Sequence, residues 1–167
     1  MHSDSVKRLA EIHIAESRKY ALRLFAFTSS VFPSEWGSTW SEIITADLLE
    51  FAFHARKVNE LCRLQDEKFP SIGTLLIKIS EGDPGNWEAN YQYALNAFVH
   101  LNDYKIGHAH ADHRAIFIGS EASLQATYVK IKTDKFSEKT ISICGLVFCF
   151  LNSVVPLLRR RFPELRF

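Results

Sequence analysis

Apolar side chains recur at helical spacing along two long segments in the first half of the chain. Residues 4–29 carry apolar residues at every third or fourth position, which is the pattern of an amphipathic helix. The stretch that follows contains Pro33 and Gly37, which indicate a turn. A second helix is expected from about residue 40 to 65, and its buried stripe consists of Ile44, Leu48, Phe51, Ala55, Val58 and Cys62. Two long helices joined by a short loop predict an antiparallel helical hairpin.

The second half of the chain mixes helical and extended patterns. A short helical piece is expected over residues 74–80, and a last apolar helix from Ser137 to about Arg161. Between residues 115 and 133, β-branched and aromatic residues alternate in part with polar ones, which indicates a β-hairpin. A third major helix is expected over about 86–107, with a buried side made of Trp87, Tyr91, Leu95, Phe98 and Leu101.

These elements together predict a mainly α protein. The expected architecture is an up-and-down bundle of four to five main helices, with a short β-hairpin appendage at about residues 115–133 between the last two helices. With 167 residues, of which 47% are hydrophobic, the chain forms one domain (residues 1–167) that buries its own core. The net charge is +1 with acidic and basic residues interspersed, which argues against a protein that coats duplex nucleic acid.

Cysteine usage and the apolar stretch near the C-terminal end bear on the compartment. Three cysteines without a CxxC spacing indicate free thiols in a reducing environment, so the expected location is the cytoplasm. Residues 140–158 carry no charge and are long enough to cross a membrane. Gly145, Asn152 and Pro156 within this stretch favour a buried core helix, while a membrane anchor stays open as the second interpretation.

A histidine-rich stretch follows the third expected helix. His108, His110, Asp112 and His113 spell HAHADH, which matches the HxHxDH signature of the metallo-β-lactamase fold. That fold needs a strand before the motif and further histidines after it. The residues before the motif have helical spacing, and no histidine follows His113, so we interpret the match as a decoy. The same four side chains remain an alternative zinc site, in which a bound water could serve a metal-dependent hydrolase.

The segments FAFHARKVNEL and LNDYKIGHAHADHR together resemble a group of small bacterial helical proteins with an HAR motif on one long helix and a K…H…R cluster after a later one. Those proteins are in turn similar to the HEPN superfamily. The resemblance implies a helical bundle that forms a homodimer and binds or cleaves RNA in a toxin or antiviral setting, without a metal or other cofactor.

The resemblance also implies a set of site residues. His108 or His110 would transfer protons, while Arg56, Lys105 or Arg114 would hold the phosphate. The family's Arg, four to six residues before the catalytic His, has no counterpart here. Either Lys105 replaces it, or Arg56 reaches the site from the neighbouring helix, or the site is inactive.

Each candidate also has a structural interpretation. His108 can be a hydrogen-bonded core residue, and Arg56 can form an ion pair with Glu60 or Glu50 on its own helix. The chain as a whole can be a non-catalytic interaction or regulatory module. Whether it is an enzyme is therefore left open by the sequence.

Overall fold

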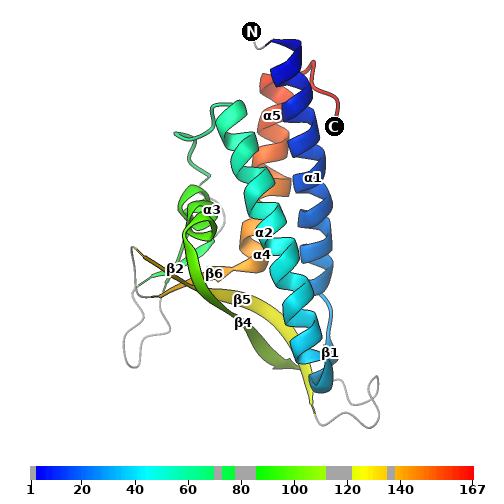
Figure 1. Cartoon of the computed structure of the whole chain (residues 1–167), viewed down its shortest axis with the longest axis vertical. Coiled ribbons are helices and arrows are strands. Elements are labelled where there is room, and N and C mark those ends of the chain that lie inside the picture. The colour runs from blue at the N-terminus through cyan, green and yellow to red at the C-terminus, as the bar shows by residue number, and fades with distance from the viewer. Residues whose placement is uncertain (1–2, 70–72, 78–85, 112–121, 135–137) are drawn as a thin grey trace.

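Two long antiparallel helices form the centre of the molecule. The computed structural model describes residues 3–69, 73–77, 86–111, 122–134 and 138–167. Helices α1 (Asp4–Thr28) and α2 (Gly37–Leu61) lie side by side along the long axis (Figure 1). The Ser3 hydroxyl caps α1 by accepting from the Val6 amide. The helical hairpin is confirmed, as is the buried stripe of α2, whose six residues are all buried.

A six-stranded antiparallel sheet accompanies these helices. The strands are β1 (Phe32–Pro33), β2 (Leu75–Ile77), β3 (Asn86–Glu88), β4 (Leu101–Ala111), β5 (Ser123–Thr133) and β6 (Lys139–Ser142). Strand β5 pairs with β4 along its whole length, and on its other side with β1 and β6. Strands β2 and β3 extend the sheet beyond β6. Among the described strands, β1, β3 and β4 each pair with one neighbour and therefore lie at edges of the sheet.

The fold is α+β, so the prediction of a mainly α bundle with a small β-hairpin is wrong. The third expected helix was too long, because α3 covers only Tyr91–Val99 and β3 occupies residues 86–88. Residues 101–111 form β4, so the expected histidine turn is a strand. The segment 74–80, expected to be helical, contributes strand β2 over residues 75–77.

Of the β-hairpin expected at residues 115–133, the described part is the second half, which forms a strand. Residues 123–133 form β5, whose partner strand is β4. Residues 112–121 lie outside the described part of the chain. The last helix begins at Ile143, not at Ser137, because the residues before it are used by β6. Its actual cap is Ser142, whose hydroxyl accepts from the Gly145 amide at 3.0 Å.

The helices cover one face of the sheet (Figure 1). Buried Ile106, Val129, Ile131 and Ile141 line the covered face and join the hydrophobic core. The third helix is joined through Gln92 to Asn59 of α2 and to Leu64, which follows α2. Asn59 Nδ2 donates to Gln92 Oε1 at 2.7 Å, and Gln92 Nε2 donates to a backbone carbonyl at 2.8 Å.

The last helical segment packs behind the hairpin. It runs through α4 (Ile143–Cys149), a π-helical turn (Phe150–Val154) and α5 (Val155–Arg161). Because Pro156 has no amide hydrogen, the α-helical hydrogen-bond pattern cannot continue into it, which accounts for the wider turn just before it. Among the described residues, one helical segment, Ile143–Arg161, has the length and hydropathy of a membrane span. Half of it is buried in the fold.

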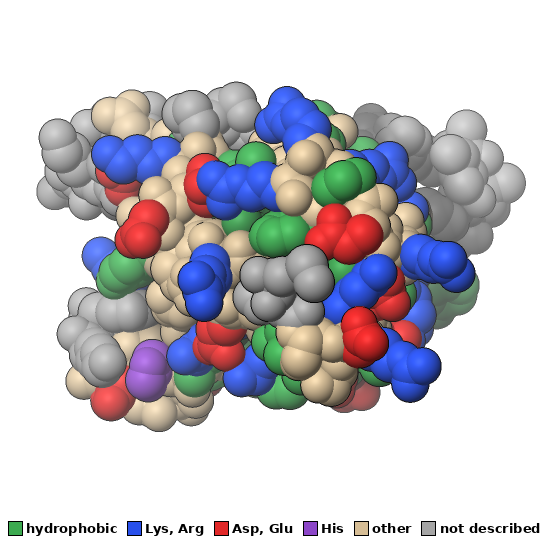
Figure 2. All heavy atoms as spheres, turned by 90° about the horizontal axis from the view of Figure 1, so that it is seen from above, with side chains coloured by type: hydrophobic (Ala, Val, Ile, Leu, Met, Phe, Trp, Pro, Cys, Tyr) green, Lys and Arg blue, Asp and Glu red, His purple; other side chains and the backbone are tan. Residues whose placement is uncertain are grey.

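Both termini lie at the end of the molecule farthest from the sheet (Figure 1). Viewed from that end, Lys and Arg side chains are intermixed with Asp and Glu (Figure 2). This end therefore carries no continuous field of one sign, as the interspersed charges of the sequence predict. The basic residue cluster Arg159, Arg160 and Arg161 occupies the last turn of α5, where it complements the helix dipole.

Candidate functional site

The two described histidines of the HAHADH stretch lie on edge strand β4. His108 pairs with Ala126, and its ring meets the Phe32 ring edge-to-face at 5.6 Å between centroids. Its Nε2 is buried and has no hydrogen-bond partner in the described part of the chain. Burial lowers the pKa of His108. His108 is therefore a half-buried packing residue, and His110, further along the strand, is exposed.

Lys105 lies on the opposite face of the sheet from these histidines. Side chains alternate between the faces of a strand, so Lys105 and Gly107 point one way while His108 and His110 point the other. At about 3.4 Å per residue, Lys105 and His110 are about 17 Å apart. The structure therefore does not bring these two candidates to a common phosphate.

Arg56 is also separated from the histidines. Its Nε donates to Glu60 Oε1 at 3.0 Å, which confirms the ion pair expected within α2. His108 contacts Phe32, whose ring stacks on Trp40 near the start of α2. From Trp40 to Arg56 the helix rises by about 24 Å, at about 1.5 Å per residue. The composite site of Arg56 with His108 is not assembled within this chain.

The alternative metal site is only partly visible. Asp112, His113 and the candidate Arg114 lie outside the described residues. Within the described ranges, no group of three or more His, Cys, Asp or Glu side chains is placed to hold a metal ion. His54 of α2 lies near Glu50, with 3.6 Å between Nε2 and the carboxylate, and near His13, with 2.8 Å between the two Nδ1 atoms.

A different set of side chains gathers on the face of the sheet that the helices leave uncovered. Lys105 of β4 is directly opposite Lys130 of β5, and Lys132 follows two residues later on the same face. Across the sheet, Lys130 pairs with Thr140 of β6, Thr140 with Leu76 of β2, and Leu76 with Trp87 of β3. We call this surface the open sheet face, defined by Trp87, Lys105, Tyr128, Lys130 and Lys132.

Two aromatic side chains belong to this face. The Tyr128 ring lies flat against Gly107, since a Cβ added to that glycine would be only 2.1 Å from the ring. Trp87 is 47% exposed, so the prediction that it is buried on a helix is wrong. Strand pairing puts it on the open sheet face, at the edge formed by β3.

The lysines of this face repel one another. Like charges directly opposite in a β-ladder are destabilising, and Lys105 faces Lys130 in this way. The Lys130 ammonium forms an ion pair with Glu138 at 2.9 Å, which raises the pKa of Lys130. That exposed pair offsets one of the three positive charges, and Asp103 of β4 is directly opposite Lys132. An anionic ligand would relieve the remaining repulsion.

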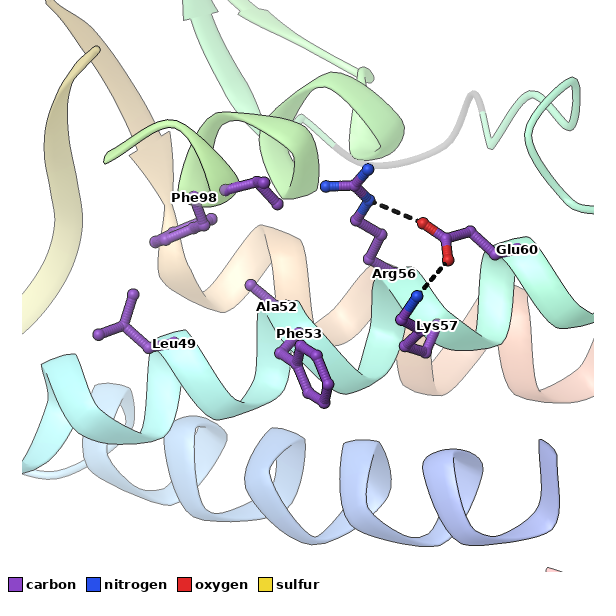
Figure 3. A pocket seen from close by; sticks show the side chains of 8 residues that line it. Leu49, Ala52, Phe53, Arg56, Lys57, Glu60 and Phe98 are labelled. Carbon is purple, nitrogen blue, oxygen red and sulfur yellow. Dashed lines mark hydrogen bonds and ion pairs between the residues drawn. The ribbon is translucent and has the colours of Figure 1, made fainter. Parts of the chain in front are cut away.

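Arg56 lies beside a shallow apolar groove between α2 and α3. The groove has a volume of about 410 Å³, and Figure 3 shows Leu49, Phe53 and Phe98 along it. Glu60 bridges two cations at its end, accepting from Arg56 Nε and from Lys57 Nζ at 2.7 Å. The bond from Lys57 is the main cause of the lowered pKa of Glu60. Both cations are thus partly neutralised on the groove side.

The chain matches no protein-family model, no curated protein and no solved structure. The HEPN resemblance therefore stays a prediction, and the α+β fold differs from the helical bundle that it implies. Of the sequence candidates, Lys105 belongs to the open sheet face. The sequence predicts a strand for Tyr128, Lys130 and Lys132 but no site. Their alternation with apolar residues in TYVKIKT is the pattern that indicates a shared face.

Proposed function

We propose that this protein binds single-stranded RNA on the open sheet face. The observation that carries the proposal is the pairing of Lys105 with Lys130 beside Tyr128 on one uncovered surface. Proteins bind single-stranded RNA through basic side chains that contact its phosphates and through aromatic side chains that stack on its unpaired bases. The chain has a net charge of only +1, so this concentration of lysines is local.

The dimensions of the face suit a few nucleotides. The row from Lys130 to Trp87 crosses three strand spacings, or about 14 Å at about 4.8 Å per strand. Tyr128 lies against Gly107 and is partly exposed, so a base could stack on the outer side of its ring. Duplex RNA does not present its bases in this way, because they are already stacked and paired.

The proposal is for binding and not for cleavage. His110 and Lys105 lie on opposite faces of β4, and Arg56 is far along α2 from His108. Proton transfer requires a group within hydrogen-bond reach of the atom that reacts. The candidate acid/base and phosphate-binding residues do not meet in this arrangement.

The aromatic contribution is tested by fluorescence anisotropy with a labelled single-stranded RNA of about twelve nucleotides. Stacking contributes about 1–3 kcal/mol per base, so Tyr128→Ala and Trp87→Ala should each weaken binding about fivefold to a hundredfold. Tyr104→Ala is the matched control, because Tyr104 is 45% exposed but lies on the other face of β4. Equal weakening by Tyr104→Ala, or no binding by the wild-type protein, would contradict the proposal.

The electrostatic contribution is tested by the salt dependence of the same binding constant. For single strands, the slope of log K against log salt concentration is about −0.7 per neutralised phosphate. Three lysines therefore predict a slope of about −2, and the triple variant Lys105→Gln, Lys130→Gln, Lys132→Gln should bring it close to zero. Lys19→Gln on α1 should leave it unchanged. If the triple variant keeps a steep salt dependence, RNA does not bind at the open sheet face.

A further inference from the structure

A second cavity lies on the helix-covered side of the sheet, at the end of α3. Its volume is about 490 Å³, which is within the range of small-molecule sites. It is formed by residues from α2, α3, β5 and β6 together with the residue that ends α3: Arg56, Tyr93, Asn96, Ala97, His100, Thr133 and Lys139. None of these residues belongs to the open sheet face.

The lining of this cavity is suited to an anion. Arg56, His100 and Lys139 can each carry a positive charge, and they come from three separate elements. Asn96 adds an amide donor, and no lining residue is a carboxylic acid. Arg56 uses its Nε for Glu60, and its two terminal nitrogens lie beneath α3, away from that carboxylate (Figure 3). Two guanidinium nitrogens can hold two oxygens of one phosphate.

Capping of α3 accounts for only part of this arrangement. A helix C-terminus carries roughly half a negative charge, which one nearby cation complements. Here three basic side chains surround a cavity beside a helix whose own last turn has none. Basic side chains from three elements therefore line one cavity that has room for a small molecule.

We propose that this cavity binds a phosphomonoester. A dianionic phosphate would accept hydrogen bonds from the terminal nitrogens of Arg56 and from His100, with Lys139 on the cavity wall beside it. The remaining volume would accommodate the attached group. The same chemistry is available in a free mononucleotide and in the terminal phosphate of an RNA chain. The proposal does not depend on RNA binding at the open sheet face.

Isothermal titration calorimetry of the full chain tests this proposal with adenosine 5′-monophosphate, inorganic phosphate and adenosine. The two phosphate-bearing probes should bind saturably, and adenosine should not bind. Arg56→Gln and His100→Gln should each weaken binding of adenosine 5′-monophosphate about tenfold or more, because each removes a contact to the phosphate. Arg56→Lys should bind with intermediate affinity, because it keeps the charge and loses the second donor.

Arg160→Gln on α5 is the control, since Arg160 is exposed and distant from the cavity in the sequence and in the fold. Thermal melting checks that each variant is folded. Adenosine binding as tightly as its monophosphate, unsaturable binding of phosphate, or unchanged affinity in folded Arg56→Gln and His100→Gln would overturn the proposal.

A further arm separates the two sources of the phosphate. An RNA oligomer with a 5′-phosphate should bind more tightly than the same oligomer without it if the terminal phosphate of RNA is the ligand, and equally if a free mononucleotide is. The unphosphorylated oligomer reports on the open sheet face alone. Failure of either proposal is therefore seen separately from failure of the other.

Discussion

At the scale of single residues, the contact between Gly107 and Tyr128 shapes the open sheet face. The ring occupies the volume where any other residue at position 107 would carry its Cβ. The sheet is also irregular here, because β5 contributes one extra residue between the pairs Gly107–Tyr128 and His108–Ala126. The absence of a side chain at Gly107 thus lets the Tyr128 ring lie against the backbone of β4.

Replacing this glycine should displace the ring. Gly107→Ala is expected to lower the free energy of unfolding by about 1–3 kcal/mol, the usual cost of overpacking, and to weaken RNA binding as Tyr128→Ala does. The double variant Gly107→Ala, Tyr128→Ala should be less destabilised than the sum of the two single variants. Strict additivity in urea denaturation would show that the contact has no energetic role.

Histidines make stability depend on pH. Burial, followed by the neighbouring His54 and Lys57, lowers the pKa of His13 against the opposing effect of Glu60, and burial alone lowers that of His108. The unfolded chain, with a histidine pKa of about 6.5, then binds protons more readily than the folded chain as pH falls below 7. The free energy of unfolding is therefore highest above the histidine pKa of the unfolded chain, and it decreases as the pH falls below that value.

Urea denaturation at pH 7.5 and pH 5.5 measures this effect, and the midpoint should be lower at pH 5.5. The Nδ1 atoms of His13 and His54 are 2.8 Å apart, a contact that needs one neutral ring to accept the hydrogen bond. His13→Gln should reduce the difference between the two pH values. A midpoint that is the same at both, or a difference that the variant leaves intact, would contradict this explanation.

At the scale of elements, the proposed RNA binding and the stability of the fold favour different residues on the paired strands β4 and β5. Lys105 faces Lys130 across the ladder, and the repulsion weakens the pair without serving the fold. Lys105→Gln is therefore expected to raise the free energy of unfolding by about 0.2–1 kcal/mol while it weakens RNA binding. A variant that is less stable, measured by urea denaturation, would show that Lys105 contributes to the fold.

The same elements show what the sequence could and could not predict. The long helices were predicted because each repeats one apolar period over seven turns, and local spacing is sufficient there. Strand β4 was missed because Leu101 continues the helical stripe of Tyr91, Leu95 and Phe98, while the edge strand has little apolar alternation. Its extended form depends on pairing with β5, a separate strand that begins at Ser123.

The candidate site was predicted only where local spacing determines it. Arg56 and Glu60 are four residues apart on one helix, and their ion pair was expected. Trp87, Lys130 and Tyr128 share a face only through the register of four strands, which no local pattern specifies.

At the scale of the whole molecule, the sheet separates two kinds of surface. One face is covered by helices and borders the cationic cavity near Arg56 and His100, while the other presents lysines and aromatic rings. The buried half of helix 143–161 belongs to the core that holds this arrangement together. Cytoplasmic location and assembly into a homodimer stay predictions from the sequence.

The central claim is that single-stranded RNA lies against the open sheet face. Ultraviolet cross-linking of the protein to single-stranded RNA that contains 4-thiouridine, followed by mass spectrometry of the peptides, tests this directly. Adducts are expected at Trp87 and Tyr128, and they should be lost when the three lysines are replaced by glutamine. Cross-links confined to the helices α1 and α2, with none on β3 or β5, would contradict the account.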